Sequence, residues 1–300
     1  MIACPTTPFR AAVDEFERHR PRRLAAAYRV TGSRTDTEDV VQDAWLRWAE
    51  VDHAGVEEAA AYLSVIASRL ALNAVRARTR RRETYIGPWL PDPIVDDDSP
   101  EWRHVHCAGL GHALDVALSR MGPEQATAFV LRRVLDLDYD SIAAVLDTSP
   151  AVARQLVSRA GRAVADLERG DVDSRVYRDS RALQALLDTL LPGDVAHVAA
   201  LLSAGSVLYS DGGDRAHAAR RPIVGRERIV RFVVGISSHE GVRVRPAVVN
   251  GSAGLLVWEG DRLTTTVTLR LALDGLVEQL YLVRNPDKLA GIDVDPPPAR

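Results

Sequence analysis

The chain of 300 residues has little of several residue types that mark particular classes of protein. It holds only two cysteines, Cys4 and Cys107, and they form no spacing pattern. This excludes a disulfide-stapled scaffold and predicts a reducing, cytoplasmic location. No apolar run reaches the roughly 18–20 residues that cross a bilayer, and the N-terminus lacks a basic start followed by a long apolar run. We therefore expect neither a membrane segment nor a signal peptide.

Lysine is nearly absent, because Lys288 is the only lysine among the 38 basic residues. The net charge of −3 argues against a uniformly basic nucleic-acid binder. The arginines are clustered, however: residues 64–82 hold six and residues 148–165 hold three, with no acidic residue in either segment. This alternation predicts local polyanion-binding sites on an otherwise acidic soluble protein. The length predicts two or three domains.

Helical periodicity dominates the first 82 residues. In "TDTEDVVQDAWLRW", the spacing of Thr35 and Glu38 predicts a capping box with Thr35 as the N-cap. Asp39, Asp43 and Leu46 share one face, which is either a solvated surface with a stray leucine or a binding surface. A different face is predicted to be buried and consists of Val41, Ala44, Trp45 and Trp48.

The next helix, "AAYLSVIASRLALNAVRARTRRR", combines an apolar face with a basic one. Its buried stripe is predicted to comprise Leu63, Ile66, Ala67, Leu70 and Ala74. A second face carries Arg69, Asn73, Arg76 and Arg80 at helical spacing. Arginine binds phosphate oxygens in a bidentate manner, and a merely solvated helix would normally include glutamates. The pattern therefore favours nucleic acid over a solvated surface.

Residues 111–167 predict four helices, at 111–119, 123–135, 139–146 and 150–167. The last two have the proportions of a helix-turn-helix. Val152, Leu156 and Ala160 would pack inward. The residues expected to face outward are Arg154, Gln155, Ser158, Arg159 and Arg162. Arginine and glutamine bind guanine and adenine edges in the major groove, so the second helix is a candidate recognition helix.

After residue 173 the pattern changes to that of an α+β domain. Helices are expected at 178–191, 194–202 and 226–236. Strand-like runs follow at "VRVRPAVV", "GLLVW", "RLTTTVTLRLAL" and "LVEQLYLV". Asn250-Gly251 and Asp274-Gly275 separate neighbouring runs and predict type I′ hairpins. We therefore expect helices packed on a curved antiparallel meander.

These segments, in this order, resemble the bacterial extracytoplasmic-function (ECF) sigma factors. The linker "YIGPWLPDP", the C-terminal domain and the motif "NPDKL" resemble the subgroup with a SnoaL-like, NTF2-like extension. The implied fold is multidomain, with two all-α sigma domains, the second containing the helix-turn-helix, and an α+β cone domain. The implied boundaries are 1–84 for sigma region 2, 85–110 for a linker, 111–172 for sigma region 4, 178–290 for the NTF2-like domain and 291–300 for a tail.

The resemblance implies a chain, monomeric when free, that binds core RNA polymerase and recognises and melts promoter DNA, while the polymerase performs the bond chemistry. The polymerase contacts would be the clamp helices of the largest subunit and the flap. The implied polymerase-binding residues are Asp36, Asp39, Asp43, Leu46 and Arg47. Those for the −10 element are Arg69, Asn73, Arg76, Arg78, Arg80 and Arg81. Those for the −35 element are Thr148, Ser149, Arg154, Gln155, Ser158, Arg159 and Arg162.

Regulation by the C-terminal domain is also implied. The implied interdomain residues are Tyr85, Pro88, Trp89, Leu90, Asp211, Gly212, Gly213, Asn285, Pro286, Asp287 and Lys288. The subgroup usually has Asp-Gly-Gly-Gly-Lys where this chain reads "DGGDR" (211–215), so Asp214 replaces a glycine and the contact of this loop is left open. Independently of the resemblance, four linker side chains are costly to expose and predict a strip docked on the C-terminal or a sigma domain: Tyr85, Ile86, Trp89 and Leu90.

The same residues also bear on other functions. An autonomous helix-turn-helix regulator with a ligand-sensing NTF2-like domain would not need the polymerase-facing N-terminal domain. An acid–base enzyme could use Asp211, His217 and His239, but these form no tight constellation. A zinc cluster of His104, His106, Cys107 and His112 lacks a second paired half. We expect no catalytic residue, cofactor or metal, and whether the cone holds a small ligand stays open.

Overall fold

The computed structural model describes residues 7–56, 58–82, 85–96, 102, 111–165, 172–190, 195–237 and 241–298. The chain divides into two compact units. The first comprises Met1–Glu83, Pro100–Ala108 and Ala117–Leu167, and the second comprises Thr84–Ser99, Gly109–Val116 and Glu168–Arg300. Residues 84–99, which follow the basic helix in the sequence, thus belong to the same unit as the C-terminal domain.

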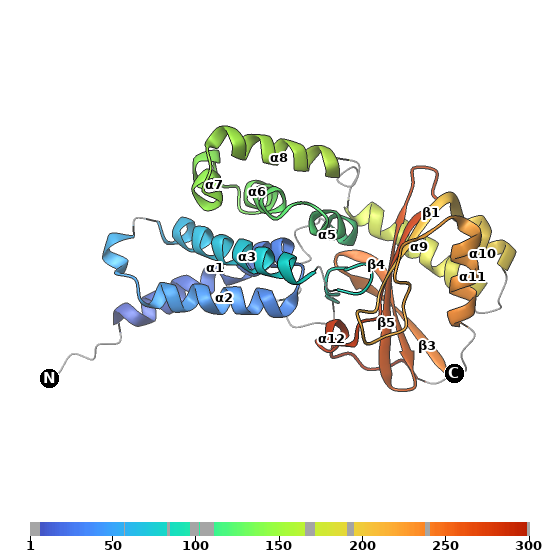
Figure 1. Cartoon of the computed structure of the whole chain (residues 1–300). Coiled ribbons are helices and arrows are strands. Elements are labelled where there is room, and N and C mark those ends of the chain that lie inside the picture. The colour runs from blue at the N-terminus through green and yellow to red at the C-terminus, as the bar shows by residue number, and fades with distance from the viewer. Residues whose placement is uncertain are drawn as a thin grey trace. The chain divides into compact units, whose positions relative to one another are not determined.

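The N-terminal part of the first unit is a bundle of α1 (Thr7–Thr31), α2 (Arg34–Ala49) and α3 (Ala59–Arg82), with a short 3₁₀ turn η1 (His53–Gly55) before α3. The three long helices lie alongside one another (Figure 1). Trp48 anchors α2 to α1, because its indole Nε1 donates to the carbonyl oxygen of Ala12 at 2.9 Å. The ring of Trp48 also stacks on His53.

Two details of this bundle differ from the sequence predictions. The N-cap of α2 is Ser33 rather than Thr35, because the helix begins at Arg34 and the Ser33 side chain accepts from the amide of Asp36. In α3, Leu63 and Ala67 are buried as predicted, whereas Ile66, Leu70 and Ala74 are only half-buried. Because α1 and α2 pack on α3 and so do helices of the region that follows, its buried surface extends to Ala71, Leu72 and Val75.

The remainder of the first unit carries α6 (Pro123–Arg133), α7 (Tyr139–Leu146) and α8 (Pro150–Val164), while the boundary between the units falls inside α5 (Gly111–Ser119). The helix-turn-helix of α7 and α8 is formed as predicted. Asp138 caps α7 by accepting from the amide of Ser141 at 2.7 Å. Asp147 ends α7 in a left-handed conformation, which turns the chain toward α8.

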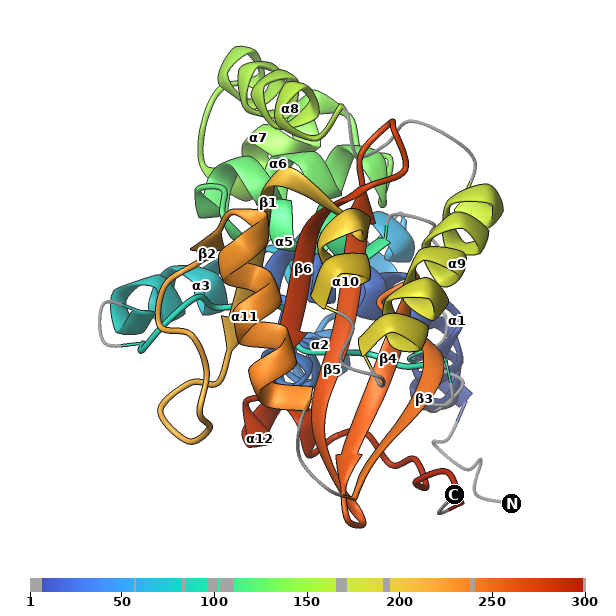
Figure 2. The same cartoon turned by 90° about the vertical axis from the view of Figure 1, so that its right-hand side faces the viewer.

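The second unit contains a mixed sheet whose described strands follow the order β2-β1-β6-β5-β4-β3. Their bounds are Leu202–Asp211 for β1, Ile223–Val224 for β2, Val242–Val249 for β3, Ser252–Glu259 for β4, Arg262–Leu271 for β5 and Val277–Val283 for β6. Figure 2 shows α9 (Val172–Leu190), α10 (Val195–Leu201) and α11 (Arg226–Ser237) against one face of the sheet. Aliphatic side chains fill this interface, among them Leu183, Leu186, Val198, Leu208, Ile229 and Leu280.

The meander of β3 to β6 confirms the strand predictions, but β1 was not predicted. It pairs in parallel with β6, so the sheet is mixed rather than purely antiparallel. The segment "LSAGSVLYSD" contains small and polar residues that weaken a strand signal. The turn at Asn250-Gly251 has the positive φ angles, 50° and 68°, of a type I′ hairpin. At Asp274-Gly275, only Gly275 has a positive φ angle. A type I′ turn needs one at both residues, so that prediction was wrong.

The opposite face of the sheet is covered by residues 85–96, by the N-terminal part of α5 and by α12 (Pro286–Leu289). Leu90 and Val95 are fully buried there against Val249, Trp258 and Tyr281. The sheet is therefore covered on both faces. This second layer contains most of the residues implied in regulation.

Candidate functional site

The implied polymerase-binding residues lie mostly on the exposed face of α2. Asp39, Asp43 and Arg47 are exposed, and Leu46 among them has 53% of its surface accessible. Asp36 differs, because it is half-buried and its carboxylate accepts from Nη1 of Arg78 at 2.7 Å. The face thus combines acidic side chains with one exposed leucine, while Asp36 is tied to α3.

The arginines implied in −10 binding contact other parts of the first unit. Nη2 of Arg69 donates to the carbonyl oxygen of Ala144 in α7 at 2.6 Å. Nη2 of Arg76 lies 2.8 Å from the carboxylate of Glu124, in the first turn of α6. These two α3 arginines are therefore engaged by the helices of the predicted −35 domain in this conformation.

The other members of the implied −10 set vary in their surroundings. Asn73 is exposed, and Arg78 forms the ion pair with Asp36. The side chains of Arg80 and Arg81 lie outside the described residues, although both belong to α3.

The contact with Arg76 also affects the ionisation of Glu124. Burial alone would raise the pKa of Glu124, but hydrogen bonds from its own amide and from Arg76 outweigh this effect and hold that pKa below its usual value.

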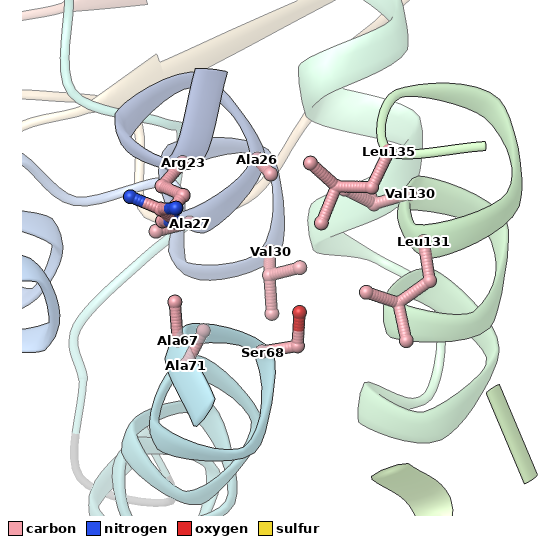
Figure 3. A pocket seen from close by; sticks show the side chains of 10 residues that line it. All are labelled: Arg23, Ala26, Ala27, Val30, Ala67, Ser68, Ala71, Val130, Leu131 and Leu135. Carbon is pink, nitrogen blue, oxygen red and sulfur yellow. The ribbon is translucent and has the colours of Figure 1, made fainter. Parts of the chain in front are cut away.

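A seam of mostly small and aliphatic residues lies between α1 and α3 on one side and α6 on the other. Leu135, two residues after the end of α6, also lines it. Figure 3 shows Val30, Ser68 and Leu131 directed toward one another across it. A cavity of about 10 Å³ remains in the seam, which is room for at most one water molecule. The seam is a packing interface rather than a ligand site. Its lining residues are Arg23, Ala26, Ala27, Val30, Ala67, Ser68, Ala71, Val130, Leu131 and Leu135.

The candidate recognition helix α8 presents the expected polar residues to solvent. Those that are exposed are Arg154, Gln155, Ser158, Arg159 and Arg162. Ser149 is the N-cap, since its hydroxyl accepts from the amide of Val152 at 3.4 Å, and Thr148 is half-buried beside it. The inward set was partly wrong: Val152 is exposed and Leu156 half-buried. The buried residues are Ala153, Ala160 and Val164.

The guanidinium of Arg154 lies over the ring of Tyr139, 4.8 Å from its centroid. Arg132 approaches the same ring at 5.5 Å and also donates to the carbonyl oxygen of Leu137 at 3.1 Å. Tyr139 begins α7, so this aromatic ring connects the first helix of the helix-turn-helix to the second. Sequence reasoning missed this residue, although an aromatic at the start of α7 beside an arginine-rich helix was a usable signal.

Lys288 is the centre of a buried cluster in the second unit. Only 8% of its surface is exposed. Nζ lies 2.9 Å from Oδ2 of Asp211 and 3.6 Å from Asp92, and it donates to the carbonyl oxygen of Leu90. The ammonium also lies 3.9 Å from the ring centroid of Trp89. The only lysine of the chain thus joins α12, β1 and the 85–96 segment.

Asp211 is fully buried and holds the same segment from the end of β1. Its Oδ2 accepts from the amide of Leu90 at 2.8 Å, and its Oδ1 accepts from the hydroxyl of Tyr85 and from the amide of Gly213. Nδ2 of Asn285 donates to the Tyr85 hydroxyl at 3.1 Å. Burial first, and then the negative charge of Asp211, raise the pKa of Tyr85 far above its usual value, so the phenol stays a donor.

The two glycines of "DGGDR" are required by space. A Cβ at residue 212 would meet the carbonyl oxygen of Ala216 at 2.5 Å, and Gly213 has φ +58° with Asn285 only 2.8 Å from a Cβ built there. Asp214 is exposed and has no positive φ. The replacement of the third glycine therefore leaves the contacts of Asp211 with Tyr85 and Leu90 in place.

The rest of the 85–96 segment is fixed by Asn250. The amide of Ile94 donates to Oδ1 of Asn250 at 2.7 Å, and the amide of Asn250 returns a bond to the carbonyl oxygen of Ile94 at 2.8 Å. Nδ2 of Asn250 also reaches Asp115 in α5 at 3.4 Å. Sequence reasoning gave Asn250 only a turn role. Ile86 is 42% exposed, so its predicted burial in the docked strip was wrong.

The remaining members of the implied regulatory set lie around this cluster. Pro88 is half-buried, Pro286 occupies the first turn of α12, and Asp287 is exposed. The amide of Asp287 donates to Oδ1 of Asn285 at 3.0 Å, which caps α12. The cap thereby orients the turn that carries Lys288.

Only some of the residues considered for an enzyme or a zinc site lie among the described residues. Asp211 is buried in the lysine cluster, His217 is exposed, and His239 lies outside the described residues. His104, His106 and Cys107 also lie outside them. His112 is buried against Tyr281 with neither ring nitrogen hydrogen-bonded. Over the described residues there is no group of three potential metal ligands.

Comparisons with known proteins agree with this arrangement. Residues 16–81 match the Sigma-70 region 2 family, and residues 111–163 match the Sigma-70 region 4 family. The ECF RNA polymerase sigma factor SigJ of Mycobacterium tuberculosis is 36% identical over 295 residues, covering 93% of each chain. The probable ECF sigma factor SigI from the same species is 24% identical and spans 90% of this chain and 92% of its own length.

A solved structure shows the same fold. The crystal structure of SigJ from Mycobacterium tuberculosis aligns with a TM-score of 0.75 and 32% identity, covering 93% of this chain and 98% of that one. This confirms two helical sigma domains followed by an NTF2-like α+β domain. In the part of the chain that the structure describes, no helix is long and apolar enough to span a membrane. The chain belongs to the ECF RNA polymerase sigma factors.

Proposed function

We propose that α2 binds the clamp helices of the largest polymerase subunit, that α3 engages the −10 element, and that α8 lies in the major groove at the −35 element. The exposed face of Asp39, Asp43 and Leu46 supports the first surface, because an apolar contact within a charged rim is typical of protein interfaces. The outward polar row of α8 supports the third surface. The chain supplies recognition, and the polymerase supplies the chemistry.

We infer further that the C-terminal unit regulates initiation by holding residues 85–96. The ion pair between Lys288 and Asp211, with both side chains bound to Leu90, is the observation that carries this inference. The segment lies in the sequence between the proposed −10 helix and the proposed −35 domain. A domain that fixes this segment restricts the separations that the two DNA-binding surfaces can adopt.

Run-off transcription with core polymerase tests both parts of the proposal. Lys288→Met in the full-length chain should change the amount of transcript several-fold, because it releases the segment without touching α2, α3 or α8. Arg262→Met is a matched control, since it removes an exposed cation from the same unit. Unchanged output together with unchanged compactness by small-angle scattering would refute the regulatory role.

The polymerase surface needs a separate test. Leu46→Glu should weaken capture by core polymerase, because it places a charge at the one apolar point of the face. Glu38→Gln, at an exposed position of α2 outside the proposed set, should leave capture unchanged. If the wild-type chain itself forms no complex with core polymerase, the proposed binding surface on α2 has no function.

A further inference from the structure

A third arginine-rich segment lies in the C-terminal unit, apart from the two helices described above. Residues 215–231 hold six arginines and only one acidic residue, Glu227, in a chain whose net charge is −3. The arginines are Arg215, Arg220, Arg221, Arg226, Arg228 and Arg231. Charge of one sign is therefore concentrated in a short stretch of a unit that is otherwise mixed.

The segment forms one edge of the second unit. It runs from the loop after β1 through β2 into α11, and Figure 2 shows β2 and α11 adjoining at the same edge of the sheet. Ile229, Val230 and Val233 bury one face of α11 against the sheet. Arg228 and Arg231, three residues apart, are exposed on its outer face.

Most of these arginines have no acidic partner within the described ranges. Among the residues that the structure describes, Arg220, Arg221, Arg228 and Arg231 are exposed and take part in no ion pair. Arg215 does pair with Asp287 at 3.5 Å, but both side chains are more than 60% exposed, and such pairs contribute little. Three other arginines of the unit do pair with carboxylates, namely Arg243 with Asp261, Arg270 with Glu278 and Arg284 with Glu259.

We propose that this edge, residues 215–231, binds the phosphate backbone of duplex promoter DNA. The inference rests on the proposed function, in which the same chain is held on a promoter. Arginine pairs with phosphate in a bidentate manner. A strongly positive surface also gains affinity for DNA, because binding releases the counterions condensed on the phosphates. Because the arginines lie on a loop and on the side of a helix, the contact positions the unit without reading sequence.

The composition of the edge favours nucleic acid over an acidic protein surface. The centre of a protein–protein interface is apolar and contains few charged residues, whereas DNA-binding surfaces are polar and strongly positive. Over residues 215–231, Val224 is the only large apolar side chain that is exposed. One exposed valine beside β1 is too little for the centre of a protein interface.

Salt-dependent promoter binding by the assembled holoenzyme tests the proposal. The variant is full-length Arg228→Ala/Arg231→Ala, and the readout is fluorescence anisotropy of a labelled promoter duplex at a series of salt concentrations. We expect the slope of log K against log salt to become shallower by about 1–2, since each lost phosphate contact removes about 0.9. Arg228→Lys/Arg231→Lys should keep the slope, and Arg262→Ala, an exposed arginine on β5, should leave it unchanged.

The possible results are distinct. Parallel slopes for the variant and the wild type, with folding verified by thermal unfolding, would overturn the proposal. A loss of affinity for core polymerase before DNA is added would also overturn it and assign the edge to an acidic polymerase surface. If the wild-type holoenzyme does not bind the promoter, the proposed function fails, and this inference fails with it.

Discussion

Arg76 and Glu124 form an ion pair that joins α3 to the first turn of α6, with 2.8 Å between Nη2 and Oε1. Arg69 makes a second link from α3, to the carbonyl oxygen of Ala144 in α7. Arg22 adds a third, from α1 to the carbonyl oxygen of Val134. Two side chains that we propose to act on −10 DNA are therefore bound to the helices of the −35 domain, and DNA must displace those contacts.

Glu124→Gln should raise the affinity of the free chain for a −10 single strand, because it weakens a contact that competes with DNA for Arg76. Both side chains are 42% exposed, so the loss of stability should stay below about 1 kcal/mol. Electrophoretic mobility shifts and chemical denaturation measure the two quantities. Asp136→Asn is the control, since Asp136 pairs with Arg132, four residues earlier in the chain, and this pair does not link two helices. Equal DNA affinity in both variants would contradict the prediction.

Lys288→Met should destabilise the second unit by about 3–5 kcal/mol, because it leaves Asp211 charged and fully buried without its cation. Calorimetric unfolding of the full-length chain measures the loss. Lys288→Met/Asp211→Asn should recover part of it, since the double change removes both charges and the two residues are in direct contact. If the loss of stability in the double variant equals the sum of the losses in Lys288→Met and Asp211→Asn, the two charges do not act as a pair.

His112 should make the second unit sensitive to acid. Burial, and then the positive charge of Lys288, lower its pKa from 6.5 to about 3. Between pH 6.5 and 3, His112 is therefore protonated in the unfolded chain but not in the folded one. Its contribution to stability is complete above pH 6.5 and declines as the pH falls toward 3. A shift of this size corresponds to roughly 5 kcal/mol over that window.

His112→Phe should flatten this decline while keeping the fold near neutral pH. Neither ring nitrogen of His112 is hydrogen-bonded within the described part of the chain, and its ring centroid lies 5.2 Å from that of Tyr281 in a T-shaped arrangement. An aromatic hydrocarbon can therefore replace the contact. Urea unfolding at pH 7, 5 and 4 measures the effect. Asp115→Asn, which removes the carboxylate three residues along the same helix, serves as the control. An acid sensitivity that is the same in wild type and His112→Phe would show that another group causes it.

The periodic parts of the fold were predictable from the sequence, and the long-range polar contacts were not. Helical spacing around Trp48 reports which face of α2 is buried. In β5 such a pattern reports less, because Thr266 and Thr268 are buried as well as Leu269. Lys288 gave no such signal, because a lone lysine is normally exposed; only the family resemblance pointed to it. Its burial depends on Asp211 and Leu90, which lie 77 and 198 residues away in the sequence. The arginine row of α3 was identified, but its contacts with α6 and α7 arise from packing between helices that a local pattern does not describe.

Tyr139 should contribute to promoter binding without touching DNA, because its ring supports Arg154 at 4.8 Å. A cation over an aromatic ring at an exposed site gains about 0.5–1 kcal/mol, and a guanidinium held in one place loses less entropy on binding phosphate or a base. Tyr139→Leu should therefore weaken holoenzyme binding to a −35 element by roughly two- to fivefold, as that energy implies. Tyr139→Phe keeps the ring and should bind like the wild type. In the background of Arg154→Ala, Tyr139→Leu should have no further effect, and an undiminished loss there would show that Tyr139 acts on the fold rather than through Arg154.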